Sequence, residues 1–450
     1  MTGIAATMDA EEGVAASTLD SLLRTMAIRG TQKTSMLLRS SNRVIGIGSC
    51  EHPNQTGPAH QDSQLVRFDR SWNGVLQPSP EDRDWARSLG KMLDSPGSFS
   101  FLAAFKGRLI AGRDRLGQKP LYYGYDERGN LAIASLLASL RQIGVRHPIA
   151  VPAGQSISFN GDSTIEGSVL ALPDEAKLSE QEAVLGLGEL LLEASARTLP
   201  ESSAIAFSGG IDSTLVAEAV RKNGAHAELL TVGLRGQAEL EHSRRIARKI
   251  GLRVTARELS ETDVLTALPE VVKIVESCDP VIVGVSIPLY FACEMAMEMG
   301  MKTLGAGQLS DELFCGYGRF EELGLRNELD EARKESFRSI QAAPTGDFEP
   351  GDKLAVSHRL ELRCPFAYLP LVLYSMKIPI QLKLKLAEGK VTRKYILRRL
   401  ANEWRLPEEV VSRPKKAVQY SSGVQRVLLK EARRRVLTLQ SFIESFVTRS

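Results

Sequence analysis

The sequence predicts a two-domain α/β protein, in which a doubly wound parallel sheet follows a smaller α+β domain made mostly of strands. Three observations support this fold class. The 450 residues are too many for one ordinary core. Short apolar runs bounded by turn residues fill positions 1 to about 165, and strand-like and helix-like runs alternate from about 175. Such alternation is typical of a parallel sheet with helices on both faces.

The first domain is expected over residues 1–170 as a series of strands separated by Gly, Asp or Asn. A helix is expected near residues 16–28. The stretch 51–80 is expected to be a long loop or insertion, because Pro, Gln and Asp recur in it. Strands are expected at 42–50, 98–105, 107–114, 119–125, 130–135 and 154–161.

The second domain is expected over residues 175–450, after a linker near 168–177. Its first helix should begin after Ser179, because Glu182, three residues on, completes a capping box. Strands are expected at 203–208, 227–234, 253–260 and 302–307. Helices are expected at 179–199, 213–224, 238–251 and 288–300.

Composition and charge exclude several classes of protein. Hydrophobic residues make up 43%, charged residues 25%, and the net charge is only +3, which disfavours a dedicated nucleic-acid binder. No apolar run is long enough to span a bilayer, and the first residues lack the basic and apolar regions of a signal peptide. The chain is therefore expected to be cytoplasmic, with no nucleic-acid or membrane partner. Scattered cysteines without a CxxC pair predict reduced thiols: Cys50, Cys278, Cys293, Cys315 and Cys364.

The stretch AIAFSGGIDS ends the first strand of the second domain in a glycine-containing loop. Gly209 and Gly210 can expose successive N–H groups to an anion, and Ser208 and Ser213 add hydroxyl donors. The helix that follows would direct its positive end at the same anion. Asp212 would repel a bare phosphate, so the pattern predicts Mg²⁺ shared between carboxylate and phosphate. The alternative is a glycine turn in which Asp212 and Ser213 only cap the helix.

A second acidic stretch, GAGQLSDELF, follows a later strand of the same domain. Because loops at the carboxyl ends of parallel strands share one sheet edge, Asp311 should lie near Asp212. Two carboxylates facing one polyphosphate would form a magnesium site. The alternative for Asp311 and Glu312 is a solvated helix start, where acidic residues are favoured.

Four blocks, FSGGIDST, GAGQLSDELFCGY, LELRCPFAYLPLV and RPKKAVQYSSGV, occur in the order and spacing of the asparagine synthetase family. The chain resembles that family from about residue 180 to 425. A fifth block, AGRDRLGQKPLYYGYDERGNLAIAS, resembles the end of the glutamine amidotransferase domain found ahead of it. The resemblance implies an ATP-pyrophosphatase (PP-loop) fold in the second domain and an N-terminal-nucleophile (Ntn) hydrolase-like fold in the first.

The resemblance also implies a reaction, that of an AMP-forming carbon–nitrogen ligase. A carboxylate, by default that of aspartate, attacks the α-phosphorus of ATP and gives an acyl-adenylate and pyrophosphate. Ammonia then displaces AMP. The charge on the α-phosphate and on the leaving pyrophosphate calls for positioned donors, Mg²⁺ and lysines. ATP as substrate and Mg²⁺ as metal follow from this chemistry.

The resemblance assigns roles to individual residues. Magnesium would be held by Asp212 and Asp311, and phosphate charge would be neutralised by Lys415 and Lys353. The adenine would contact Val232, and the ribose and α-phosphate would pass Gly307. The ATP and pyrophosphate contacts implied are Ser208, Gly209, Gly210, Asp212, Ser213, Val232, Ala306 and Gly307.

The acyl-transfer end of the site departs from the family pattern. Gln308 stands where the family has a glutamate close to the acyl-adenylate, and an amide cannot take up a proton. Tyr368 stands where the family has an aspartate, and Glu361 is expected among the catalytic residues. Arg393 and Lys394 are explained equally well by a basic helix face. These departures leave open another carboxylate, as in β-lactam-forming relatives.

The first domain departs further, because Thr2 replaces the cysteine that the family's glutaminase uses. A threonine with a free α-amino group can act as a nucleophile, but an alkoxide forms far less readily than a thiolate. The family's glutamine-binding Ser/Gly-Asp-Thr-Glu stretch is missing between Asn73-Gly74 and Ser98. Glutamine hydrolysis is therefore expected to be lost, with free ammonia or a separate glutaminase as the nitrogen source. A homodimer and a non-catalytic nucleotide-binding scaffold stay open as alternatives.

Overall fold

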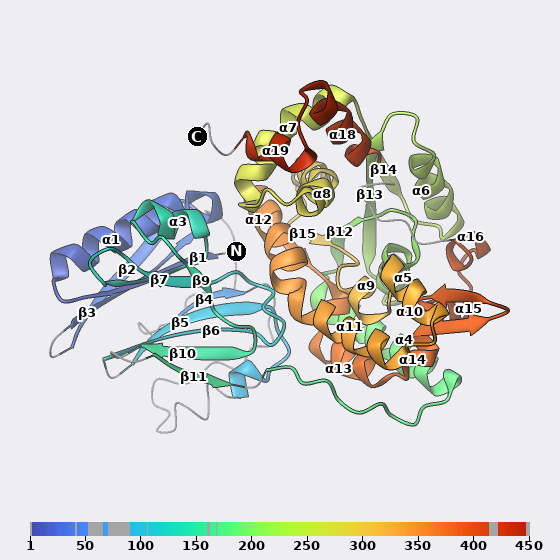
Figure 1. Cartoon of the computed structure of the whole chain (residues 1–450), viewed down its shortest axis with the longest axis horizontal. Coiled ribbons are helices and arrows are strands. Elements are labelled where there is room, and N and C mark those ends of the chain that lie inside the picture. Colours follow the sequence, from blue (N-terminus) through green and yellow to red (C-terminus); the bar gives the residue numbers. More distant parts are fainter. Residues whose placement is uncertain are drawn as a thin grey trace. The chain divides into compact units, whose positions relative to one another are not determined.

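The computed structural model describes residues 2–40, 43–52, 66–70, 91–105, 107–159, 163–167, 169–413 and 422–446 (Figure 1). The chain divides into two compact units, Met1–Ala171 and Leu172–Ser450. This division falls inside the stretch 168–177, where the sequence predicts a linker.

The first unit is built on two antiparallel sheets, with strand orders β2-β3-β1-β8-β7-β9 and β11-β10-β6-β5-β4. Side chains of both sheets, among them Ile4, Ile47, Leu102 and Ile157, share one buried cluster, so the two sheets pack face to face. Helices α1 (Glu12–Thr25) and α3 (Leu137–Gln142) contribute to a second cluster with the other face of the first sheet. The strands are β1 (Thr2–Asp9), β2 (Gln32–Ser40), β3 (Arg43–Glu51), β4 (Val66–Arg70), β5 (Phe99–Phe105), β6 (Arg108–Arg113), β7 (Tyr122–Tyr125), β8 (Leu131–Ala134), β9 (Ile149–Ala150), β10 (Gln155–Phe159) and β11 (Ser163–Gly167).

All six strands expected in this unit are confirmed, as β3, β5, β6, β7, β8 and β10. Strand β1 was not predicted, because it is buried on both faces and its small residues show no alternation. The predicted loop at 51–80 is wrong in part, since β4 lies inside it. The residues on either side, 53–65 and 71–80, lie outside the described ranges.

The second unit contains a five-stranded sheet in the order β14-β13-β12-β15-β16. All four pairings are parallel, which confirms the doubly wound prediction. The chain runs from β12 outward to β14 and then returns to β15 on the other side of β12. Ligands bind in such sheets at the point where the order reverses, here between the loops after β12 and β15. The strands are β12 (Ser202–Ala206), β13 (His226–Leu234), β14 (Val254–Leu259), β15 (Thr303–Gly305) and β16 (Glu361–Arg363).

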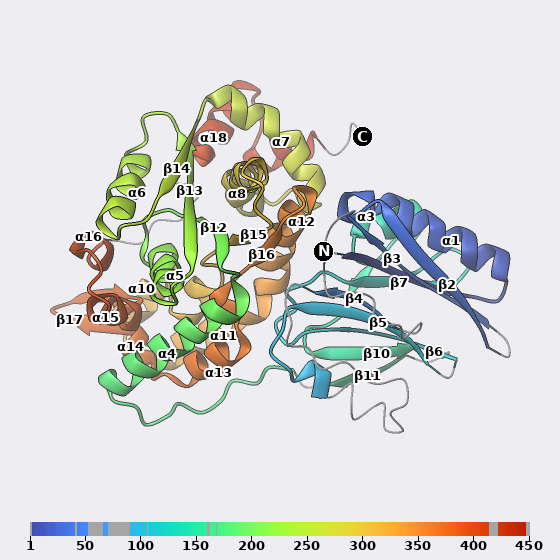
Figure 2. The ribbon, with the colours of Figure 1, turned by 180° about the vertical axis from the view of Figure 1, so that it is seen from behind.

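Helices cover both faces of this sheet (Figures 1 and 2). On one face α5 (Ile211–Lys222) packs with α4 (Glu180–Thr198) and α15 (Tyr395–Glu403). On the other face α8 (Pro280–Glu298) packs with α7 (Glu261–Val275) and α12 (Glu349–Ser357). The remaining elements are α6 (Ala238–Lys249), α9 (Ser310–Leu313), α10 (Gly318–Leu325), α11 (Leu329–Ala343), η2 (Pro344–Phe348), η3 (Pro365–Ala367), α13 (Leu369–Lys377), α14 (Ile380–Lys383), β17 (Leu384–Ala387), β18 (Lys390–Arg393), α16 (Glu408–Val411), α18 (Val424–Arg434) and α19 (Leu439–Glu444).

Local chemistry determines where these helices begin. The predicted capping box of α4 is confirmed, because Ser179 Oγ accepts the Glu182 N–H at 3.3 Å and Glu182 Oε2 accepts the Ser179 N–H at 2.8 Å. Helix α8 begins eight residues earlier than expected, since Asp279 caps it by accepting the Val281 N–H at 2.7 Å. The expectation that no apolar run is long enough to span a bilayer is wrong for α8, which is long and apolar enough by length and composition alone. However, 56% of the most apolar stretch of α8 is buried inside the fold.

Candidate active site

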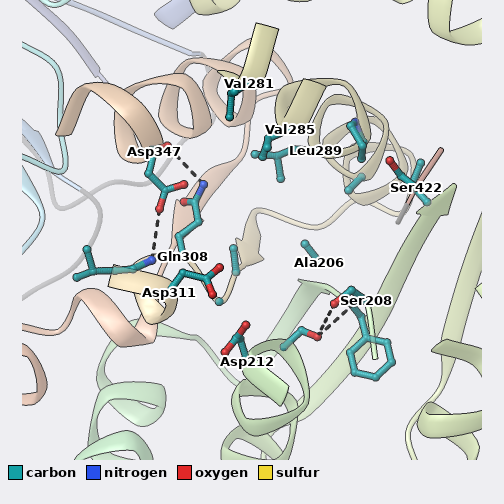
Figure 3. Close-up of a pocket in the computed structure, with 18 of the residues that line it drawn as sticks. Ala206, Ser208, Asp212, Val281, Val285, Leu289, Gln308, Asp311, Asp347 and Ser422 are labelled. Carbon is teal, nitrogen blue, oxygen red and sulfur yellow. Dashed lines mark hydrogen bonds between the residues drawn. The ribbon is translucent and has the colours of Figure 1, made fainter. Parts of the chain in front are cut away.

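A cavity of about 520 Å³ lies at the carboxyl ends of β12, β13 and β15 (Figure 3). One wall is the loop that joins β12 to α5, and a second is the loop that follows β15. The third wall is a stripe of α8 formed by Val281, Val285, Leu289 and Ala292, which recur at helical spacing. The predicted site residues in its described lining are Ser208, Asp212, Ser213, Val232, Ala306, Gly307, Gln308 and Asp311.

The loop after β12 is held in one conformation by its own polar groups. Ser208 N–H donates to Ser213 Oγ at 3.2 Å, and Gly210 N–H donates to Ser208 Oγ at 3.2 Å. Helix α5 begins at Ile211, two residues before the expected start, because Gly210 takes the N-cap position. Gly209 has φ +66°, and a Cβ there would lie 2.9 Å from the His242 ring, so this position requires glycine.

His242 contacts the backbone of the loop between β12 and α5. Burial lowers the pKa of His242, and the Arg413 and Arg245 guanidinium groups lower it further, while the hydrogen bond with Gly209 opposes them. The neutral ring suits its contacts, since Nε2 lies 3.0 Å from the Gly209 carbonyl and Nδ1 lies 3.3 Å from Arg245 Nη2. Nε2–H therefore donates to Gly209, and Nδ1 accepts from Arg245.

Asp212 and Asp311 lie together at the base of the cavity, on either side of the Lys394 ammonium group. Lys394 Nζ is 2.6 Å from Asp212 Oδ1 and 2.7 Å from Asp311 Oδ1. Ser310 Oγ also donates to Asp212 Oδ1 at 2.7 Å. Lys394 is only 1% exposed, so its charge is compensated inside the protein by these two carboxylates.

Sequence reasoning left Lys394 as one of two residues on a basic helix face, and so missed its place in the site. Lys394 has φ 57° and takes the N-cap position, one residue before α15 begins at Tyr395. The helical spacing of the buried residues in α15 therefore does not place the Lys394 side chain, and it could not have indicated the two carboxylates that Lys394 contacts.

Gly316 makes room for this ion pair. A Cβ at Gly316 would lie 1.8 Å from Asp311 Oδ1 and 2.4 Å from Lys394 Cε. We expect Gly316→Ala to lower the free energy of unfolding by about 1–3 kcal/mol, as overpacking does in cores. Gly318→Ala is the matched control, because nothing lies within 4 Å of a Cβ there. Thermal unfolding of both variants checks the prediction, and equal melting temperatures would contradict it.

Gln308 projects into the cavity and is held at both ends of its amide (Figure 3). Its Nε2 donates to the Asp347 carbonyl at 3.4 Å, and its Oε1 accepts from Cys364 Sγ at 3.2 Å. The neighbouring Leu309, with φ 72°, donates its N–H to Asp347 Oδ2 at 3.3 Å. These contacts fix the loop after β15 against η2.

Glu312 and Tyr317 complete the acidic end of the cavity. Tyr317 Oη donates to Glu312 Oε1. Burial raises the pKa of Glu312, and the charge of Asp311 raises it further. The pKa of Tyr317 is likewise raised by burial, with Glu312, Asp311 and Asp347 adding to the effect. The tyrosine therefore keeps its proton and stays a hydrogen-bond donor.

Three residues expected near the chemistry are not brought to the cavity. Lys353 is buried in α12, where it pairs with Glu276 at 2.7 Å. Glu361 is the first residue of β16, so it lies at the amino end of that strand, whereas the cavity lies at the carboxyl ends of its strands. Its carboxylate accepts a hydrogen bond from Arg363 Nε at 3.0 Å. The Tyr368 hydroxyl donates to Glu193 of α4 at 2.7 Å, and burial, then this contact, raises the pKa of Tyr368 to about 12.

The remaining predicted residues either are not described by the structure or belong to the first unit. Lys415 and the pair Asn73-Gly74 fall outside the described residues. Thr2 opens β1 in the first unit, where its carbonyl accepts from Arg29 Nε at 3.2 Å, and its role as a nucleophile stays a prediction. The prediction of unpaired thiols is confirmed, because all five cysteines are free.

A family model described as asparagine synthase matches residues 186–333 and 324–447, and these two ranges together include every residue of the described cavity lining. The chain belongs to the asparagine synthase family. A second model, described as a glutamine amidotransferase domain, matches residues 81–142. This asparagine synthase family member therefore has a match to a glutamine amidotransferase domain in its first unit, ahead of the asparagine synthase match in its second unit.

Named relatives agree with this placement. The chain is 28% identical over 390 residues to a putative glutamine-hydrolyzing asparagine synthetase of Methanocaldococcus jannaschii, covering 76% of this chain and 72% of the relative. It is 28% identical over 354 residues to asparagine synthetase B of Escherichia coli, covering 74% of this chain and 62% of the relative. It is 27% identical over 357 residues to a root asparagine synthetase of Pisum sativum, covering 76% of this chain and 60% of the relative.

Proposed function

We propose that this asparagine synthase family member activates a carboxylate with ATP, releases pyrophosphate and transfers the acyl group to ammonia. Aspartate, which would give asparagine, is the default carboxylate. The observation that carries the proposal is the convergence of Asp212, Asp311 and Lys394 beside the glycine loop, in a cavity that also contains Gln308. Cleavage between the α- and β-phosphates develops negative charge on the leaving pyrophosphate, which a lysine, backbone N–H groups and a metal ion held by carboxylates would stabilise.

The donor set at this end fits Mg²⁺. The ion prefers carboxylate oxygens and is usually bound by one or two of them together with substrate phosphates. Asp212 and Asp311 supply two carboxylates on the cavity lining. In the described residues no group of three or more His, Cys, Asp or Glu side chains could hold a metal ion alone, so nucleotide oxygens would complete the shell. Bound there, Mg²⁺ would neutralise charge on the phosphates.

The chain's own groups would bind and orient the nucleotide. The N–H groups at the start of α5, with the Ser208 and Ser213 hydroxyls, would donate to the leaving pyrophosphate. The positive charge of Lys394, which contacts both carboxylates, would stabilise negative charge on the phosphates. Val232 and Ala306 would line the space for the base, and Gly307 would let the ribose and α-phosphate pass close to the backbone. Lys415 is proposed as a further phosphate lysine.

A second candidate function keeps this chemistry and changes the acid. It is favoured by Gln308, whose amide donates to Asp347 and cannot accept a proton from an incoming amine. For the same reason, the second candidate function includes a ligase in which an amine of the substrate itself attacks the acyl-adenylate and closes a ring. With Thr2 in place of cysteine, we propose free ammonia or a separate glutaminase as the nitrogen source.

The test is an assay of AMP and pyrophosphate over a panel of carboxylates, with ammonium and then with glutamine. We expect AMP to form with ammonium and aspartate, and glutamine alone to support little reaction. AMP formation with a different acid would correct the substrate and retain the chemistry. Release of ADP, or no nucleotide turnover with any acid, would contradict the proposal.

A further inference from the structure

We propose that His242 is a positioning residue for ATP: its neutral imidazole holds the Gly209 carbonyl and so directs the donors of the loop between β12 and α5 at the β- and γ-phosphates. The inference rests on the proposed function, because that function assigns this loop to the leaving pyrophosphate. His242 is not among the described residues that line the cavity. It would therefore act through the backbone of the loop and not by touching the nucleotide.

The contact with His242 fixes the direction of one peptide group. His242 Nε2 lies 3.0 Å from the Gly209 carbonyl oxygen. That carbonyl and the Gly210 N–H belong to the same trans peptide group, so they point in opposite directions. With the carbonyl turned to His242, the Gly210 N–H faces the other way and donates to Ser208 Oγ at 3.2 Å. Because Ser208 lines the cavity, the imidazole on one side of the peptide determines where a donor lies on the other.

The same peptide group orders the two hydroxyls that the proposed function gives to pyrophosphate. Ser208 Oγ, which accepts the Gly210 N–H, lies 3.3 Å from Ser213 Oγ. Ser213 Oγ in turn accepts the Ser208 N–H at 3.2 Å. These donors already lie close together without a ligand, so a phosphate could bind them with little further ordering of the loop.

The loop needs an external contact because its backbone is intrinsically free. Gly209 has φ +66°, and a second glycine follows it. Glycine loses more conformational freedom on folding than any other residue. Helix α6 supplies the restraint, since a Cβ at Gly209 would lie 2.9 Å from His242 Cδ2 and 3.2 Å from Ser243 Cα. Without the imidazole, the Gly209 carbonyl would lose this donor and the loop would gain room to move.

The charges around His242 favour a neutral ring. They come from Arg245 and Glu239 of α6 and from Arg413, which follows α16, and Glu239 is paired with Arg413 at 3.3 Å. His242 is only 6% exposed, and burial lowers its pKa; the hydrogen bond to Gly209 opposes this effect, while the two guanidinium groups add to it. Nδ1 lies 3.3 Å from Arg245 Nη2, so a second ring proton would face another donor and another positive charge. Protonation, which needs a pH below the ordinary histidine pKa of about 6.5, would therefore displace the ring from the loop.

The experiment measures binding without turnover, by titration calorimetry of the full chain with Mg²⁺ at neutral pH. The probes are α,β-methylene ATP and AMP, which differ in the two phosphates that the loop would bind. His242→Asn removes the donor, because its amide reaches the place of Nδ1 but not that of Nε2. We expect this variant to bind the ATP analogue about 10-fold more weakly, as for the loss of one hydrogen bond to a charged group, and to bind AMP as the wild type does. His242→Gln, whose amide nitrogen can reach the place of Nε2, should restore most of the affinity for the analogue.

The pH dependence tests whether the neutral ring is the form that holds the loop. Between neutral pH and a pH of about 5.5, the wild type should lose more affinity for the ATP analogue than His242→Gln, because an amide does not titrate. His226→Gln is the matched control, since His226 is an exposed histidine at the start of β13, and it should follow the wild type throughout. Superimposable acid profiles of the wild type and His242→Gln would overturn the inference.

Two further results would also overturn the inference. One is a His242→Asn variant that binds the ATP analogue as tightly as the wild type. The other is an equal loss of affinity for the analogue and for AMP, because a merely structural role would disturb both. Turnover distinguishes these results from failure of the proposed function. A loss confined to the analogue, in a protein that forms AMP with no acid, would contradict the function and leave the inference standing. AMP formation with an unchanged KM for ATP in His242→Asn would do the reverse.

Discussion

Lys394→Met is expected to lower the free energy of unfolding of the second unit by about 3–5 kcal/mol, the usual cost of removing one partner of a buried ion pair. Methionine fills a similar volume but leaves Asp212 and Asp311 facing each other without the ammonium group that now lies within 2.7 Å of both. For a unit of this size the melting temperature should fall by roughly 10 °C. Thermal unfolding at neutral pH and low ionic strength measures the effect.

The cause can be separated from lost packing by removing the acids as well. A variant that combines Lys394→Met with Asp212→Asn and Asp311→Asn carries no buried charge at this point, and it should recover most of the lost stability. Two adjacent carboxylates without a cation have raised pKa values, so the defect of the single variant should grow as pH rises and shrink in acid. A single variant as stable as the wild type would show that the pair contributes nothing.

The sheet of the second unit could be predicted because each of its signals is local. The strand and helix runs from Ser202 to Leu259 follow one another within short segments, and the Ser179 capping box lies within four residues. The predicted helix boundaries were wrong where a single capping residue determines the start of the helix. Asp279 extends α8 by capping it at Pro280, ahead of the apolar run that revealed the helix.

The candidate site could be predicted only where a short motif includes the side chains that would bind the ligand. The glycine loop with Asp212 and the stretch with Asp311 are such motifs, and the structure places both carboxylates against the same Lys394 ammonium group. Lys394 is 182 positions from Asp212, and nothing in the sequence around either residue specifies the other. Asp347 likewise acquires its place through η2, whose π-helical turn has no periodic pattern. The catalytic role that the resemblance implies for Glu361 stays a prediction, because a sequence block gives its position at the start of β16 but not its distance from the cavity.

Asp311→Asn is expected to reduce AMP formation at least about 100-fold while the fold is retained. A ligand carboxylate contributes more than the outer contacts whose loss costs roughly 10–100-fold in metal affinity or activity. Asp212 still pairs with Lys394 in this variant, so the melting temperature should change little. The measurements are the rate of pyrophosphate release as a function of Mg²⁺ concentration, and thermal unfolding of the same sample.

The Mg²⁺ dependence distinguishes the two roles open to Asp311. If its carboxylate binds the metal that accompanies ATP, Asp311→Asn should shift half-saturation to higher Mg²⁺, and excess Mg²⁺ should restore part of the rate. If Asp311 served only to compensate the charge of Lys394, pyrophosphate release would keep its Mg²⁺ dependence, and only stability would change. A normal rate at low Mg²⁺ would therefore contradict the metal role. It would leave Asp212 as the carboxylate to which the nucleotide's metal must bind, because Asp212 lies at the start of α5 beside the phosphate loop.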